Sequence, residues 1–174
     1  MITTEVRFGD DVQKCYYAYV QPQFSYIPTD WISLAPGYRQ IVKRYPTNSN
    51  HWIPEYVPIF DLVLTGRAKE WKFEHRSRVE YIISRSSSYP WLYRDRFRVF
   101  LPIHWTQYDI TPFFDNEIFW REANGINEDR VAVGIKEKFT SFFTCETSYT
   151  ARFLKAIPHW TQQNVFLIWF NFFL

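Results

Sequence analysis

Glycine is scarce in this chain, and no glycine-rich phosphate-binding motif is present. Only 5 glycines occur in 174 residues, and neither GxGxxG nor GxxxxGK[ST] is found. The two cysteines, Cys15 and Cys145, form no CxxC pair, and the 4 histidines show no zinc-ligand spacing. These absences argue against a nucleotide-binding α/β fold and against a metal centre, so we expect neither a cofactor nor a metal.

The sequence also lacks the usual signs of export and of a membrane-spanning helix. Met1 is followed by Ile-Thr-Thr-Glu, which has neither the basic start nor the apolar core of a signal peptide. The apolar C-terminal stretch 165–174 is far shorter than the roughly 20 residues that a transmembrane helix needs. We therefore expect an intracellular protein, cytoplasmic or nuclear, with reduced thiols, and contact of the apolar C-terminal stretch with a membrane surface is the less favoured alternative.

Aromatic residues are abundant, and they favour strands. They make up 21% of the chain, within a hydrophobic fraction of 47%, and we expect one domain over residues 1–174. Thr111-Pro112 is typical of a helix start, and Gly125 of a helix end, so we predict a helix over 112–123. The expected fold class is α+β and strand-rich: an antiparallel sheet or a distorted β-barrel with one or two helices.

Basic charge is concentrated in one part of the chain. The formal net charge is only +2, yet residues 67–98 hold nine Lys and Arg against four Asp and Glu. Arginines occupy every second position from Arg94 to Arg98, which places them on one face of a strand. If residues 70–83 pair with 91–101 as a hairpin centred near Ser87, the expected cross-strand pairs are Arg76 with Arg98, Arg78 with Arg96, and Glu80 with Arg94.

This arginine face leads to the first functional hypothesis, a non-enzymatic protein that binds a polyanion. Arginine suits bidentate contacts to phosphate, and nearby aromatic rings can stack on unpaired bases. RNA or single-stranded nucleic acid is the expected ligand, with an acidic protein surface as the alternative. The predicted binding residues are Arg76, Arg78, Arg94, Arg96, Arg98, Lys72, Trp91 and Tyr93.

Two further hypotheses use other parts of the chain. An assembly protein, of the kind that viruses and mobile elements encode, would form homo-oligomers through the apolar C-terminal strand and leave a folded core when that strand is deleted. A small enzyme or sugar binder would use the tetrapeptide His-Trp-Thr-Gln, which occurs at 104–107 and 159–162. Its pocket would contain His104, Trp105, His159 and Trp160, although tryptophans of this kind are more often core residues. The sequence favours a binding protein over an enzyme.

Overall fold

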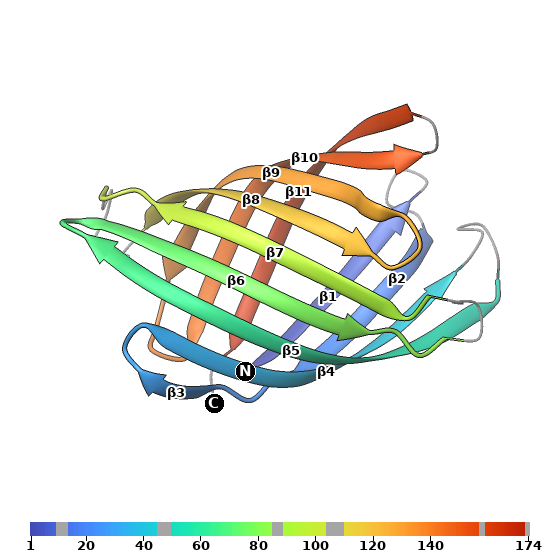
Figure 1. The fold of residues 1–174 in the computed structure, drawn as a ribbon, viewed down its shortest axis with the longest axis horizontal. Helices are drawn as coiled ribbons and strands as arrows, with labels where there is room; N and C mark the ends of the chain where they lie inside the picture. The colour runs from blue at the N-terminus through green and yellow to red at the C-terminus, as the bar shows by residue number, and fades with distance from the viewer. Residues whose placement is uncertain (10–13, 45–49, 85–88, 104–109, 157–158, 173–174) are drawn as a thin grey trace.

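The protein is all-β. The computed structural model describes residues 1–9, 14–44, 50–84, 89–103, 110–156 and 159–172, and within these ranges it has eleven strands and no helix (Figure 1). The described part of the chain accordingly has no helix that could cross a membrane. The α+β expectation is therefore wrong. The strands are β1 (Ile2–Gly9), β2 (Lys14–Pro22), β3 (Tyr26–Thr29), β4 (Ile32–Arg44), β5 (Trp52–Ala68), β6 (Trp71–Tyr81), β7 (Trp91–Phe100), β8 (Thr111–Arg121), β9 (Gly125–Lys138), β10 (Phe143–Ala156) and β11 (His159–Phe172).

Ten of these strands form a closed antiparallel barrel. From β4 to β11 each strand pairs with the next, while β2 pairs with both β1 and β4. The barrel closes where β1 meets β11, with Ile2 opposite Phe172 and Thr3 opposite Asn171. β3 pairs with β4 outside the ring. Figure 1 shows β6 and β7 on the near wall and β1, β2, β10 and β11 on the far wall.

The segment predicted as a helix is strand β8. Its side chains alternate between the barrel interior and the outer surface, which is the two-residue period of a strand. Acidic residues that fit the first turns of a helix instead pair with arginines of β7, and only the tertiary structure supplies those partners. Gly125, with φ of 65°, begins β9 rather than ending a helix. The buried residues of β8 include Phe113, Asp115, Glu117 and Phe119, and the exposed ones are Phe114, Ile118 and Trp120.

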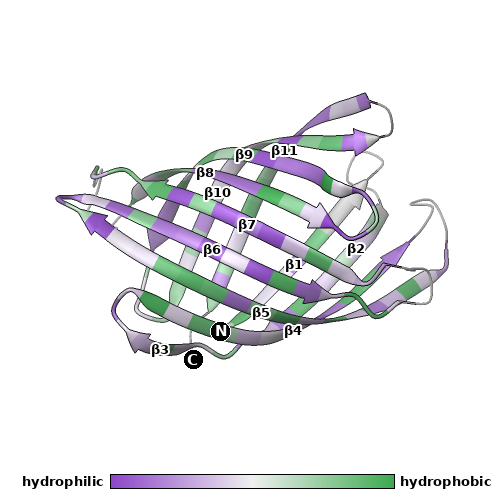
Figure 2. Cartoon of the chain, in the orientation of Figure 1, coloured by the Kyte–Doolittle hydropathy of each residue, from purple (hydrophilic) through white to green (hydrophobic). Residues whose placement is uncertain are grey.

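The barrel is polar inside and apolar outside. Among the described residues, fifteen buried side chains are polar or charged and nine are hydrophobic. Large hydrophobic residues lie exposed on the outer wall instead, so green and purple alternate along β6, β7 and β8 in Figure 2. This is the reverse of a water-soluble barrel, whose interior is filled by apolar side chains. Apolar packing inside is centred on Ile41, Val57 and Ile59, against Tyr17, Tyr19 and Ile82.

The C-terminal apolar stretch belongs to the barrel wall. β11 pairs with β10 from His159 to Phe172, and its outward side chains Phe166, Ile168, Phe170 and Phe172 are exposed. Leu167 and Trp169 line the interior. Cys15 and Cys145 are both free and half-buried.

Candidate functional site: a charged barrel lumen

The arginine face predicted from the sequence points into the barrel. β6 and β7 pair as a hairpin, but the register differs from the expected one by two residues: Arg76 lies opposite Arg96, Arg78 opposite Arg94, and Glu74 opposite Arg98. The predicted register was wrong because loop geometry sets the register of a hairpin, and the sequence of this loop does not specify that geometry. A shift of two residues keeps every side chain on its face, so the arginines still share one surface.

Carboxylates from neighbouring strands meet these arginines across the lumen. Asp61 comes from β5, Glu80 from β6, Asp115 and Glu117 from β8, and Glu146 from β10. Glu80 was expected on the arginine face, but the other four were not predicted there, because the set is scattered over 86 positions, from 61 to 146. The alternation of polar and apolar residues within β8 was the signal that could have placed two of them inside. We call the inward-facing charged side chains of β4 to β10 the lumen network.

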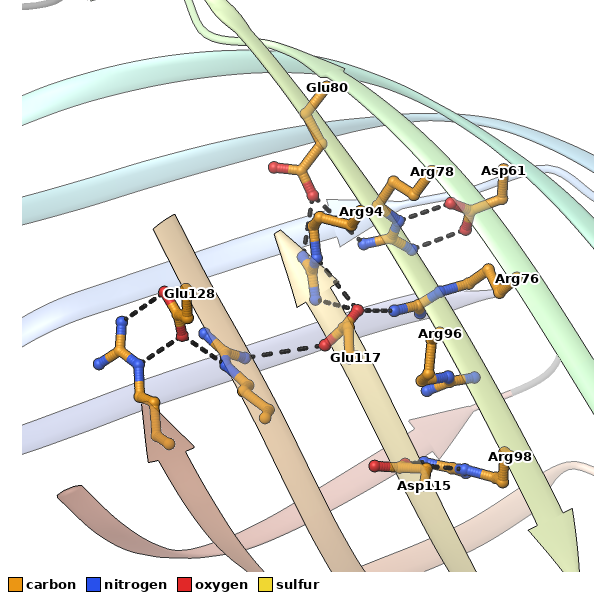
Figure 3. A network of polar contacts seen from close by, with 12 residues as sticks. Asp61, Arg76, Arg78, Glu80, Arg94, Arg96, Arg98, Asp115, Glu117 and Glu128 are labelled. Atoms are coloured by element: carbon orange, nitrogen blue, oxygen red, sulfur yellow. Dashed lines mark hydrogen bonds and ion pairs between the residues drawn. The ribbon is translucent and has the colours of Figure 1, made fainter. Parts of the chain in front are cut away.

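The central pairs of the lumen network are close and buried (Figure 3). Arg78 makes a two-pronged contact with Asp61, with Nη2 donating to Oδ2 over 2.6 Å. Arg94 donates to Glu80 over 2.9 Å and to Glu117 over 2.8 Å. In the low-dielectric interior, such charge-assisted hydrogen bonds are about twice as strong as neutral ones. They offset the large cost of removing these ions from water.

The network continues towards both sides of the central cluster. Arg98 bridges Asp115 on β8 and Glu146 on β10, with both nitrogen–oxygen distances at 2.7 Å. Glu128 on β9 accepts hydrogen bonds from Arg130 and Arg152. The Arg98–Glu146 pair therefore links two strands, β7 and β10, that are not neighbours in the sheet.

Aromatic rings inside the barrel support the arginines. The guanidinium carbon of Arg94 lies 4.6 Å from the centroid of the Phe119 ring, and that of Arg130 lies 4.3 Å from the same centroid. Arg98 lies 4.0 Å from the ring centroid of Phe113. Cation–π contacts of this kind are strongest where water is excluded, so the buried aromatics of β8 stabilise the lumen charges.

The lumen retains open space beside the network. A cavity of about 680 Å³ is lined by side chains from most strands, with acidic and basic residues in similar number. This volume lies within the usual range of small-molecule sites, roughly 300 to 1,000 Å³. No group of three or more His, Cys, Asp or Glu side chains arranged to hold a metal ion occurs in the described ranges.

Of the remaining predicted binding residues, Lys72 shares the inward face with the arginines, whereas Trp91 and Tyr93 do not. Lys72 faces inward, with Nζ 4.7 Å from the centroid of the Phe100 ring. Trp91 and Tyr93 point outward and are 46% and 38% exposed, because residues at odd positions of β7 lie on the outer wall. The strand therefore separates the predicted stacking surfaces from the predicted charges.

The alternative His-Trp pocket is only partly visible. His104 and Trp105 lie outside the described residues. His159 and Trp160 are exposed at the start of β11, so Trp160 is not a core residue. Nothing in the described part of the chain brings this pair to the lumen network.

A polar cluster on β6 and β7 interrupts the apolar outer wall. Asp95 on β7 lies 2.7 Å from Nε2 of His75 and accepts hydrogen bonds from Ser77 over 2.9 Å and Tyr93 over 2.8 Å. Both carboxylate oxygens thus have partners within the same sheet. Because its oxygens are hydrogen-bonded, the carboxylate can lie on an apolar surface at a lower cost in free energy.

Comparison with known proteins gives a family but no activity. No curated protein and no solved structure matches the chain. Residues 1–163 match the family described as Protein of unknown function (DUF2490). Since the match covers most of the sequence, the chain belongs to the DUF2490 family.

Proposed function

We propose that this chain is a membrane-embedded β-barrel, which sits in a lipid bilayer and encloses an ion-paired polar lumen. The observation that carries the proposal is an apolar belt on the outer wall. We define the outer belt as the exposed large hydrophobic residues on the ten barrel strands. It includes Ile2, Val6, Val20, Tyr38, Tyr56, Phe60, Trp71, Val79, Tyr81, Trp91, Tyr93, Phe97, Phe114, Ile118, Trp120, Ile126, Val133, Tyr149, Phe166, Ile168, Phe170 and Phe172.

The extent of the outer belt supports a lipid surrounding. Every strand of the ring contributes to it, so it encircles the barrel rather than forming one patch. Water-soluble monomers rarely expose a continuous apolar patch larger than a few hundred Å². A protein partner would cover one side, whereas lipid covers all sides at once.

Strand length and polarity fit the same proposal. A membrane-crossing strand needs about 9 to 11 residues, and β4 to β11 each have at least 10. Membrane barrels combine an even number of strands, an apolar outer band with aromatic residues near its edges, and a polar interior. Trp71 begins β6 and Trp91 begins β7 at opposite ends of the barrel, as such aromatic edges require.

The proposal departs from three expectations based on the sequence. Membrane contact was not favoured, because the apolar stretch 165–174 is too short for a transmembrane helix. The intracellular setting and the RNA ligand stay predictions without support from the geometry, because the arginines are enclosed and paired with carboxylates. A nucleic acid would have to enter the barrel and displace those partners to reach them.

Vesicle flotation tests the proposal directly. The full chain is refolded from urea with phosphatidylcholine vesicles, washed with alkaline carbonate, and centrifuged through a density gradient. We expect it to float with the lipid after the wash and to resist trypsin across the barrel strands. A folded monomer that stays in the dense fraction without detergent would refute membrane residence.

A further inference from the structure

The arginines on the β6–β7 wall are not equally compensated. Arg94 and Arg98 each contact two carboxylates, and Arg78 contacts Asp61 and lies 3.7 Å from Glu80. Among the described residues, Arg76 pairs only with Glu117 and Arg96 only with Glu74. Two neighbouring guanidiniums in the middle of the wall thus have half the anionic contacts of the others.

The carboxylate that serves Arg76 is also shared. Oε1 of Glu117 accepts a hydrogen bond from Arg76 and another from Arg94, and its other oxygen lies 3.9 Å from Arg130. One negative charge therefore balances parts of three positive charges. The shortage of negative charge falls on the Arg76–Arg96 pair, whose members stand opposite each other in the register.

Unsatisfied hydrogen-bond donors mark the same place. The Nε atoms of Arg76 and Arg96 are both buried and without a protein acceptor. In Figure 3, Arg96 lies between the Arg76–Glu117 pair and the Arg98–Asp115 pair. Both side chains line the lumen cavity. An unpaired buried N–H on a charged group is costly, and two adjacent guanidiniums repel each other unless an anion lies between them.

We propose that Arg76 and Arg96 form a binding site for a small oxyanion in the lumen, of the phosphate or carboxylate type. Each guanidinium presents several N–H groups in a fixed plane. In both residues the Nε–H side of that plane has no protein acceptor. An anion with two or more oxygens would accept hydrogen bonds from both guanidiniums and supply the missing negative charge. Chloride has no such pair of acceptors and is expected to bind less well.

Calorimetric titration of the full chain in detergent tests this site. Inorganic phosphate and acetate are titrated separately, with chloride at equal ionic strength as the reference anion. We expect saturable binding at one site for at least one oxyanion, together with a raised thermal unfolding midpoint. The oxyanion that binds with the higher affinity, phosphate or acetate, identifies the ligand class.

Matched variants assign the binding to the pair. Arg96→Gln is expected to weaken oxyanion affinity about tenfold or more, because it removes a charged donor. Arg152→Gln is the control: Arg152 also faces the lumen, but its guanidinium is held by both oxygens of Glu128. This control should keep its affinity within about twofold. If Arg96→Gln fails to fold, Arg96→Lys keeps the charge but loses the fork and should show the weakened affinity.

Three results would overturn the site. They are the absence of saturable binding, equal binding of chloride, or wild-type affinity in the Arg96 variant that folds. The site stands whether or not the barrel lies in a bilayer. Failure of the titration and failure of the vesicle flotation are therefore separate outcomes.

Discussion

Val133→Arg distinguishes a lipid surrounding from water at the outer belt. Val133 lies on β9 opposite Phe114 on β8 and Tyr149 on β10, and all three side chains are exposed. In water, an arginine at such a surface position changes stability by no more than about 0.5 kcal/mol. On the lipid face near the middle of a bilayer it costs about 2 to 4 kcal/mol.

Ile126→Arg is the matched control on the same strand. Ile126 is 50% exposed and Val133 is 54% exposed, but Ile126 stands one residue after the start of β9. An arginine near the interface costs only about 0 to 1 kcal/mol, because its charged end reaches the headgroups. The two substitutions are therefore equivalent in water and unequal in a bilayer.

Denaturant unfolding in lipid vesicles, followed by tryptophan fluorescence, measures the difference. We expect Val133→Arg to lower the folding equilibrium constant by a factor of roughly 30 to 700, from 1.4 kcal/mol per tenfold change. Ile126→Arg should lower it by roughly fivefold or less. Equal effects of the two variants, within about 0.5 kcal/mol, would refute the reasoning that places the outer belt in lipid.

Three further predictions concern the network, the outer cluster and the last strand. Glu117→Gln should destabilise the barrel by about 3 to 5 kcal/mol in denaturant unfolding, because it leaves buried arginines without their shared carboxylate, whereas exposed Glu122→Gln should have little effect. His75→Phe should cost about 1 to 3 kcal/mol by removing a partner of Asp95, and replacing Asp95 with Leu in the same chain should recover part of that loss; no recovery would contradict the pairing. Deleting residues 165–174 should abolish the protease-resistant barrel, because β11 pairs with β10 and closes the ring against β1. A truncated chain that keeps a folded core would contradict this prediction and support the assembly hypothesis.

Local patterns in the sequence predicted individual strands better than they predicted the fold class. The alternation of residues 70–83 and 91–101 gave both strands and the common face of Arg76 and Arg96. The same alternation in 111–121 was outweighed by Thr-Pro and Gly signals, which fit a helix start and end but also occur at strand ends. The β-sheet was thus confirmed and the helix over 112–123 was wrong.

The direction of the arginine face could not be predicted in the same way. A two-residue period shows that the two faces of a strand differ in polarity, but it does not show which face is in contact with water. The alternation in β7 is compatible with charges outside a soluble sheet or inside a membrane barrel. Only the closure of ten strands into a ring decides which face is enclosed.

The sequence by itself determined that this chain forms amphipathic strands, with arginines on one side and aromatic residues on the other, because side chains alternate along any extended backbone. The tertiary structure alone decided that the charged side is the interior. It did so by bringing Asp61, Glu117 and Glu146, which lie far apart in the sequence, to the arginines of β6 and β7. Enclosed charges are stable only when opposite charges surround them, and that balance depends on barrel closure rather than on neighbours in sequence.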